Sequence, residues 1–207
     1  VRAYYNDTAI AFLLEWNDRF KDTVHQPGPD ADLKGSTYPK IDLRKAQAEK
    51  LRDAVRLQFP LAIPAGPERP HFFLGNPGKP VALWHWQADL NEAGKNAVVK
   101  ELAEGLQRPI KVQEEAAQDV TGAGVWKDGR WKAVMVRALV PKDGSKDVTF
   151  EVGKLIPFAV QAWDGDTGEK GLMMSLSSWN YVTLEAPTPL TAYVYSLLGV
   201  GFVGLLE

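Results

Sequence analysis

The chain contains no cysteine among its 207 residues. This absence excludes disulfides, thiolate nucleophiles, iron–sulfur ligation and covalent haem attachment through a Cys-x-x-Cys-His motif. Histidine is scarce as well, because only His25, His71 and His85 are present. A zinc site would therefore need carboxylate ligands, and the sequence shows no close ligand spacing for one.

The sequence also lacks an excess of charge. Its formal net charge is −2 and it has no Lys/Arg-rich stripe, so nothing attracts it to nucleic acid. Fingerprints of serine hydrolases, phosphate loops and dinucleotide-binding folds are missing too. No nucleophile is paired with an evident base, which makes an enzyme acting by itself the weaker interpretation. A hydrophobic content of 45% is enough for one folded domain of ordinary size.

The two ends of the chain are unusual. The first residue is Val1, without a Met or a signal-like segment, which predicts a processed chain or a trimmed fragment. Residues 189–207 are almost free of charge and mix aromatic residues with glycine. About 18 apolar residues is the lower bound for a spanning helix. We expect this tail to begin a membrane anchor or to dock on a partner; the alternative is that it packs on the domain.

Most of the remaining chain has the pattern of a β protein. Short apolar runs are separated by Gly/Asp turns at spacings near 8–12 residues, which predicts a two-layer antiparallel β-sandwich over residues 1–188. Two amphipathic stretches, 43–58 and 93–106, predict helical insertions. The strand at 9–16 is apolar throughout and is expected to be buried on both faces. The expected strands cover residues 1–5, 9–16, 81–86, 124–126, 131–140, 147–152, 155–163 and 173–185.

His85 is the most informative single residue. It lies between Trp84 and Trp86, so strand alternation sends His85 to one face and both indoles to the other. A histidine in an apolar strand is costly unless its nitrogens find partners. Either it is a core histidine bonded to a carbonyl, or it is an axial ligand in a haem pocket. The adjacent Met173 and Met174, placed at the start of a strand, are either core filler or soft thioether ligands.

Several short motifs, in the same order and spread over nearly the whole chain, resemble the ethylbenzene-dehydrogenase-type haem-b domain. That family supplies the gamma subunits of molybdenum–iron–sulfur oxidoreductases and related cytochromes of nitrate-reductase operons. The resemblance implies a β-sandwich with helical insertions that carries electrons on a non-covalent haem b. The motifs are Tyr4-Tyr5-Asn6-Asp7, Trp16-Asn17-Asp18, Pro80-Val81, Trp84-His85-Trp86, Gly124-Val125-Trp126-Lys127-Asp128-Gly129-Arg130-Trp131, Arg137-Ala138-Leu139, Phe158-Ala159-Val160-Gln161-Ala162-Trp163-Asp164-Gly165 and Ser177-Ser178-Trp179.

The family's iron ligands do not transfer directly. In the gamma subunits the iron is bound by a Met in a Phe-x-Met-Gly stretch and by a Lys ahead of the Ser-x-Trp strand. Here the first stretch carries Leu74 in place of that Met, and the second position is Met174. A His85–Met174 pair would restore a workable ligation, with His71 as the rival for the first ligand and Met173 as the rival for the second.

The resemblance also implies a setting. The domain would exchange electrons with a partner subunit that carries iron–sulfur clusters or c-type haem. It would lie in the periplasm or on the outer face of the cytoplasmic membrane, and it would have no turnover of its own. The competing interpretation is a carbohydrate-binding sandwich without haem, because seven Trp residues could form a sugar-stacking face. The two interpretations differ in the Trp side chains: a sugar-binding face needs them exposed, whereas core residues are buried.

Overall fold

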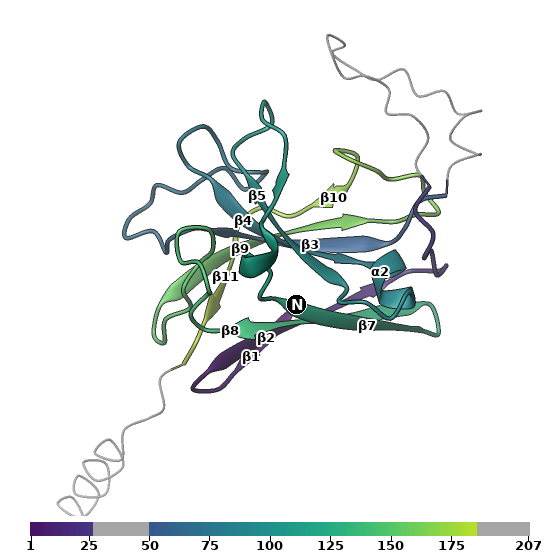
Figure 1. The fold of residues 1–207 in the computed structure, drawn as a ribbon, viewed down its shortest axis with the longest axis horizontal. Helices are drawn as coiled ribbons and strands as arrows, with labels where there is room; N and C mark the ends of the chain where they lie inside the picture. The colour runs from purple at the N-terminus through teal and green to yellow at the C-terminus, as the bar shows by residue number, and fades with distance from the viewer. Residues whose placement is uncertain (27–49, 186–207) are drawn as a thin grey trace, which may run out of the picture.

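The computed structural model describes residues 1–26 and 50–185, which form two antiparallel β-sheets packed face to face (Figure 1). The predicted two-layer β-sandwich is therefore confirmed. The tail at 189–207 and the beginning of the first expected helix, 43–49, lie outside the described residues.

The smaller sheet has four strands in the order β1-β2-β8-β7. It contains two hairpins, β1–β2 and β7–β8. Asp128 and Gly129 join β7 to β8 with φ angles of +51° and +73°, as a two-residue turn of type I′ requires. The strands are β1 (Arg2–Tyr5), β2 (Ala9–Asn17), β7 (Thr121–Lys127) and β8 (Arg130–Ala138).

The expectation that β2 is buried on both faces is wrong. Ile10, Phe12 and Leu14 are at most 2% exposed, whereas the residues between them are only half-buried. The strand thus has one face on the core, which is normal for a sheet that another sheet covers on one side only.

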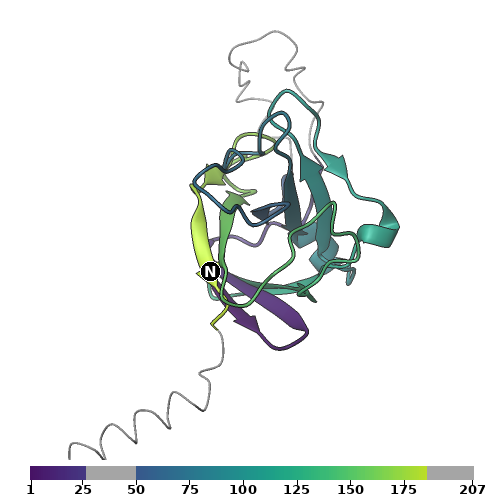
Figure 2. The ribbon, with the colours of Figure 1, turned by 90° about the vertical axis from the view of Figure 1, so that its left-hand side faces the viewer.

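The larger sheet has seven strands, in the order β10-β9-β3-β4-β5-β6, with β11 paired to β9. Most of these strands can be followed by their labels in Figure 1, and Figure 2 shows the same fold turned by 90°. β3 and β4 are central and buried along their whole length. The strands are β3 (Ala54–Pro60), β4 (Val81–Gln87), β5 (Val98–Ala103), β6 (Lys111–Val112), β9 (Leu155–Trp163), β10 (Ser175–Leu176) and β11 (Asn180–Thr183).

The two predicted helical insertions are wrong where the structure describes them. Residues 54–58 belong to β3 and residues 98–103 to β5. In β3, neighbours on both sides complete the backbone hydrogen bonds, so burial in the sheet outweighs local helix propensity. Over the described ranges, helical structure is limited to α2 (Ala88–Glu92) and the 3-10 turn η1 (Glu115–Ala117).

Two of the expected strands also differ. Residues 147–152 form no strand, because this segment crosses the end of the sandwich and buries Val148 and Phe150. The stretch 173–185 is broken into β10 and β11, which pair with different ends of β9.

The core lies between the two sheets and is rich in aromatic rings. Phe12 from β2 packs against Phe59 of β3 and Trp84 of β4, with ring centroids 5.4 and 5.8 Å apart. Trp86 makes an edge contact with Trp131 of β8, at 5.0 Å. These contacts place the inner faces of both sheets in one hydrophobic cluster.

Candidate functional site

His85 lies in the middle of β4, on the face of the larger sheet that points away from the smaller one. Trp84 and Trp86 point the opposite way into the core and are fully buried, which confirms the predicted alternation. His85 itself is only 8% exposed. The outer face of this sheet is therefore covered around the histidine.

The hydrogen bonds of His85 within the described ranges run through Nδ1. This atom lies 3.1 Å from Nη2 of Arg56, 3.3 Å from Oε1 of Glu101 and 3.3 Å from Nε2 of Gln87. Arg56 stands directly across from His85 on β3, and Glu101 reaches it from β5. Arg56 and Glu101 also form a buried ion pair of 2.8 Å. Three neighbouring strands thus build one cluster of a cation, a carboxylate and an imidazole.

The environment keeps the imidazole neutral. Burial lowers the pKa of His85 to about 4, and the nearby Arg56 guanidinium acts in the same direction against the opposing effect of Glu101. Burial alone would raise the pKa of Glu101, but hydrogen bonds and charge from His85 and Arg56 lower it overall. Glu101 is therefore a carboxylate at neutral pH.

The proton of the neutral ring has two possible positions. With a proton on Nδ1, His85 donates to Glu101, and the lone pair of Nε2 is free for a metal. With the proton on Nε2, Nδ1 accepts from Arg56 and Gln87 instead. The first arrangement is the carboxylate–histidine pairing that orients metal-bound imidazoles in many proteins.

A chain of amide side chains extends the cluster along the same face. Arg56 Nη1 donates to Gln161 Oε1 at 3.1 Å, and Gln161 Nε2 donates to Gln58 Oε1 at 3.1 Å. Gln58 also accepts from the backbone N–H of Leu74 at 2.9 Å and donates to the carbonyl of His71 at 3.0 Å. The turn that contains Leu74 is thereby fixed to the sheet.

Leu74 occupies the place where the resembling family carries a ligand methionine. It is 2% exposed and has a positive φ of 60°, which is unusual for a residue with a side chain. Its side chain belongs to a second, smaller hydrophobic cluster with Val81, Leu83 and Ala103 on the outer face of the sheet. The substituted position thus lies on the same sheet face as His85.

The expectation that the two methionines begin a strand is wrong. Met173 and Met174 lie in the turn before β10, and both are half-buried. Ser175 pairs with Ala162 of β9, so extending this register by one residue would set Met174 beside Trp163. The ring of Trp163 lies 5.3 Å from that of His85, centroid to centroid. In the order of the sheet, β9 with Trp163 lies between β10, which follows the methionine turn, and the strands β3 and β4.

His71, the rival first ligand, has different surroundings. It is exposed, its ring stacks on Phe72 at 4.5 Å, and its Nδ1 accepts from the backbone N–H of Phe73 at 3.2 Å. Arg56, Glu101, Gln161 and Trp163 are the members of the site that the sequence analysis missed. The first two fell inside stretches predicted to be helical, where charged residues suggest a solvated face.

None of the seven Trp side chains, all of which the structure describes, is exposed. Trp84, Trp86 and Trp131 are fully buried and Trp163 is 6% exposed. The others are half-buried. A sugar-stacking platform needs exposed rings, so the carbohydrate-binding interpretation loses the feature that motivated it. Separately, no helix within residues 1–26 and 50–185 is long and apolar enough to cross a membrane.

Comparison with known proteins agrees with the resemblance seen in the motifs. The profile of the family described as ethylbenzene dehydrogenase matches residues 1–108, just over half of the chain. This range contains β1 to β5 and therefore His85, Arg56 and Glu101.

Two curated relatives cover more of the chain. One, from Haloferax mediterranei, is described as a proposed respiratory nitrate reductase heme subunit, ORF7. It is 27% identical over 157 residues, which is 74% of this chain and 52% of the relative. The other is chlorate reductase subunit gamma from Ideonella dechloratans, 25% identical over 167 residues, 80% of this chain and 56% of the relative. The chain thus spans about half the length of these relatives.

Proposed function

Because this chain belongs to the ethylbenzene dehydrogenase family, we propose that it holds one haem and passes electrons within a larger redox complex. The observation that carries the proposal is the buried, neutral His85 with Glu101 beside its Nδ1. The relative named a heme subunit and the one named a reductase gamma subunit support the same function.

The imidazole of His85 and the thioether of Met174 are both groups that can bind haem iron. Glu101 can hold the Nδ1 proton of His85, which leaves the lone pair of Nε2 free to bind a metal. Met174 would offer a thioether from the turn before β10. Thioether and imidazole are both established axial ligands, and a bound haem with this pair supplies a one-electron couple of fairly high potential. Trp163, whose ring lies 5.3 Å from that of His85, would limit the access of water to this side of the imidazole.

We propose His85 and Met174 as the axial ligands, with His71 and Met173 as the alternates. His85 is favoured over His71 because it is buried and oriented by charged neighbours, whereas His71 is exposed. Since no cysteine is available for thioether bonds, the haem would be a non-covalent haem b.

The partner and the location are further parts of the proposal. The two relatives are named as subunits of reductases, so we propose a partner subunit that carries iron–sulfur clusters or c-type haem. In agreement with the family resemblance, we place the domain in the periplasm or on the outer face of the cytoplasmic membrane. Cell fractionation of the native host tests that location.

The visible spectrum of the purified chain tests the haem itself. After haem-replete expression we expect a Soret band, and acid–acetone should extract all of the haem into the organic phase. A colourless protein would contradict the proposal. Haem that stays with the protein after extraction would contradict the non-covalent assignment.

Substitutions then test the ligands. His85→Ala should abolish the low-spin spectrum or the haem itself, while His71→Ala should leave both intact. Met174→Leu should keep the haem but make it high-spin or lower its potential. Met135→Leu is a matched control, because Met135 lies in the core on β8. A spectrum that responds to His71→Ala or Met173→Leu instead would transfer the role to the alternate residue.

A further inference from the structure

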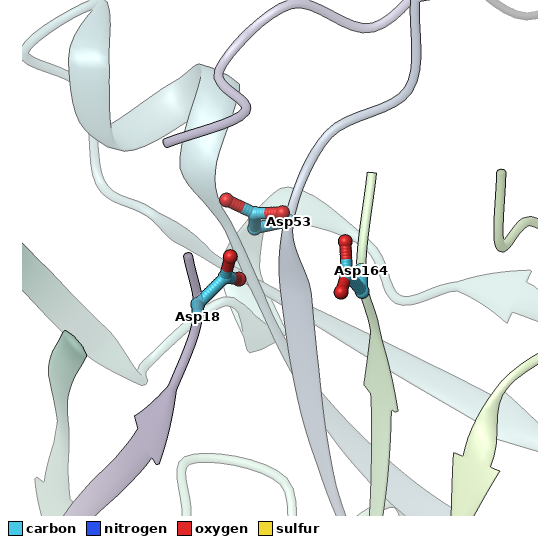
Figure 3. Close-up of side chains that lie close together, drawn as sticks. All are labelled: Asp18, Asp53 and Asp164. Carbon is cyan, nitrogen blue, oxygen red and sulfur yellow. The ribbon is translucent and has the colours of Figure 1, made fainter. Parts of the chain in front are cut away.

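Three carboxylates meet at one end of the sandwich, away from the outer-face cluster around His85. Asp18 follows β2, Asp53 precedes β3 and Asp164 follows β9 (Figure 3). One oxygen from each lies within 4.8 Å of the other two. Figure 3 shows the Asp18 carboxylate pointing toward the gap between Asp53 and Asp164.

The backbone holds these segments together independently of the carboxylates' charges. Ala54 pairs with Trp163, so Asp53 and Asp164 extend two adjacent strands. Gly165 passes so close to the chain before β3 that a Cβ there would lie 2.2 Å from the carbonyl oxygen of Leu51. Only glycine allows this approach, and it is the approach that brings Asp164 next to Asp53.

The hydrogen bonds leave oxygen lone pairs unused inside the cluster. Asp53 accepts three bonds, from Trp131 Nε1 and from the backbone N–H groups of Asp22 and Gly165, at 2.8–3.0 Å. Asp18 is only 5% exposed, and its Oδ2 is buried without a hydrogen-bond partner. A buried carboxylate oxygen without a donor or a cation is expensive.

The ion pairs of the described residues do not include these aspartates. Within the described residues, no ion pair joins Asp18, Asp53 or Asp164, or the neighbouring Asp22, to a Lys, Arg or His side chain. The negative charge of the cluster therefore has no ion-pair partner among the described residues, and a bound cation would supply one.

We propose that Asp18, Asp53 and Asp164 bind one Ca²⁺ ion, which joins the ends of β2, β3 and β9. All of the donors are oxygen atoms, as a hard cation requires. Ca²⁺ takes carboxylate oxygens in a flexible geometry, whereas Mg²⁺ demands near-ideal octahedral geometry and usually keeps several waters. Carboxylates from three separate segments, with oxygens within 4.8 Å of one another, suit the less demanding ion. The ion supplies the missing partner of Asp18 Oδ2.

The site connects the two layers of the fold. β2 belongs to the smaller sheet, and β3 and β9 belong to the larger one. An ion held by all three carboxylates would therefore fasten the sheets at this end. Its role would be stability, and it is independent of whether the chain binds haem.

Calorimetric titration of the full chain tests the proposal. The protein is treated with EDTA, exchanged into metal-free buffer and titrated with CaCl2, with MgCl2 in a parallel run. We expect one Ca²⁺ per chain with a Kd of about 1 mM or tighter, and weaker binding of Mg²⁺. Ca²⁺ at about 100-fold above Kd should raise Tm by roughly 5–10 °C. Tighter binding of Mg²⁺ than of Ca²⁺ would overturn the choice of ion.

Two variants locate the ion. Asp18→Asn and Asp164→Asn keep the side-chain shape but remove a charge, and each should weaken Ca²⁺ binding at least tenfold. Asp7→Asn makes the same charge change at an exposed position and should bind Ca²⁺ as the unaltered chain does. Two results would overturn the proposal: no Ca²⁺ binding by the unaltered chain, or a gain of Tm by Asp18→Asn that is the same with and without Ca²⁺. The second would mean that the carboxyls share protons rather than a cation.

Discussion

At the scale of single residues, the defining feature is the buried ion pair of Arg56 and Glu101 beside His85, the candidate ligand. Arg56 is 5% exposed and Glu101 is 8% exposed, and each is the ion-pair partner of the other. Breaking a buried pair from one side leaves an uncompensated charge, which is strongly destabilising. Such a costly pair is readily explained if its task is to orient His85.

The first prediction concerns Glu101. Glu101→Gln should lower the free energy of unfolding by about 3 kcal/mol because Arg56 loses its counter-charge. Urea denaturation measures this change, and the Soret band should shift as well if Glu101 positions His85. Glu15→Gln on the solvent-facing side of β2 is the control and should change neither. An altered stability with an unaltered spectrum would leave Glu101 with a structural role alone.

The second prediction concerns pH. The pKa of His85 is about 4 in the folded chain and near 6.5 in the unfolded chain, so between these values only the unfolded state takes up the proton. This contribution to stability is complete above pH 6.5 and is lost as the pH falls toward 4. In the haem-free chain, His85→Gln should therefore lose less stability than the unaltered chain between pH 7 and 4.5, as measured by urea denaturation. Equal losses would show that His85 does not titrate as described.

At the scale of elements, β7 is set apart by how closely it approaches the larger sheet. A Cβ on Gly124 would lie 2.5 Å from a ring carbon of Trp86, and one on Gly122 would lie 2.4 Å from a methyl group of Val98. The two glycines let β7 lie against the edge of the core. The same closeness holds Trp86 in place, and so fixes the strand that carries His85.

The third prediction follows from this packing. Gly124→Ala should destabilise the chain by about 1–3 kcal/mol through overpacking against Trp86. A Cβ on Gly144 would meet no atom within 4 Å, so Gly144→Ala is the matched control and should leave Tm nearly unchanged. Thermal unfolding of both variants, followed by near-ultraviolet circular dichroism, measures the difference. An equal Tm for the two would contradict the close approach.

At the scale of the whole molecule, a second set of buried charges links the sheets. Asp147 contacts Lys100 of β5 at 3.0 Å and Arg137 of β8 at 2.6 Å, and it accepts from Trp84 Nε1 at 2.9 Å. The side chains of Asp147, Lys100 and Arg137 are all 0% exposed. Charge pairing therefore joins strands of the two sheets that share no backbone hydrogen bonds.

The fourth prediction tests this link. Asp147→Asn should cost about 3–5 kcal/mol, because two buried cations lose their shared carboxylate. That loss corresponds to a Tm lower by roughly 10 °C. The matched change Asp143→Asn, in an ion pair near the surface with Lys146, should leave Tm unchanged. A small effect at Asp147 would mean that Asp119, the other partner of Lys100, carries the charge alone.

The fifth prediction concerns the boundary of the domain. In the part of the chain that the structure describes, the last strand, β11, ends at Thr183. We therefore predict that the sandwich needs no residue after 188. Deleting residues 189–207 should leave haem binding intact and improve solubility, because the deleted stretch is almost wholly apolar. Expression yield and the Soret absorbance per chain measure both effects. Loss of folding on truncation would show that the tail belongs to the core.

Local chemistry in the sequence was enough to predict some of this protein. The Asp128-Gly129 turn needs residues that tolerate positive φ, and so it predicts a hairpin without any tertiary information. Alternation along Trp84, His85 and Trp86 predicts which side chains enter the core, because the strand period of two is a property of the backbone. The sandwich follows from repetition of such segments.

Tertiary structure decided the rest, because the deciding contacts are far apart in the chain. Residues 54–58 and 98–103 belong to stretches whose amphipathic pattern suggests helices, and only pairing with neighbouring strands makes them β-structure. Arg56 lies 29 positions before His85 and Glu101 lies 16 positions after it, so no spacing rule predicts that the three meet. The aspartates at 18, 53 and 164 likewise converge only through strand register. Burial of a charge depends on what the fold stacks around it, which local sequence does not contain.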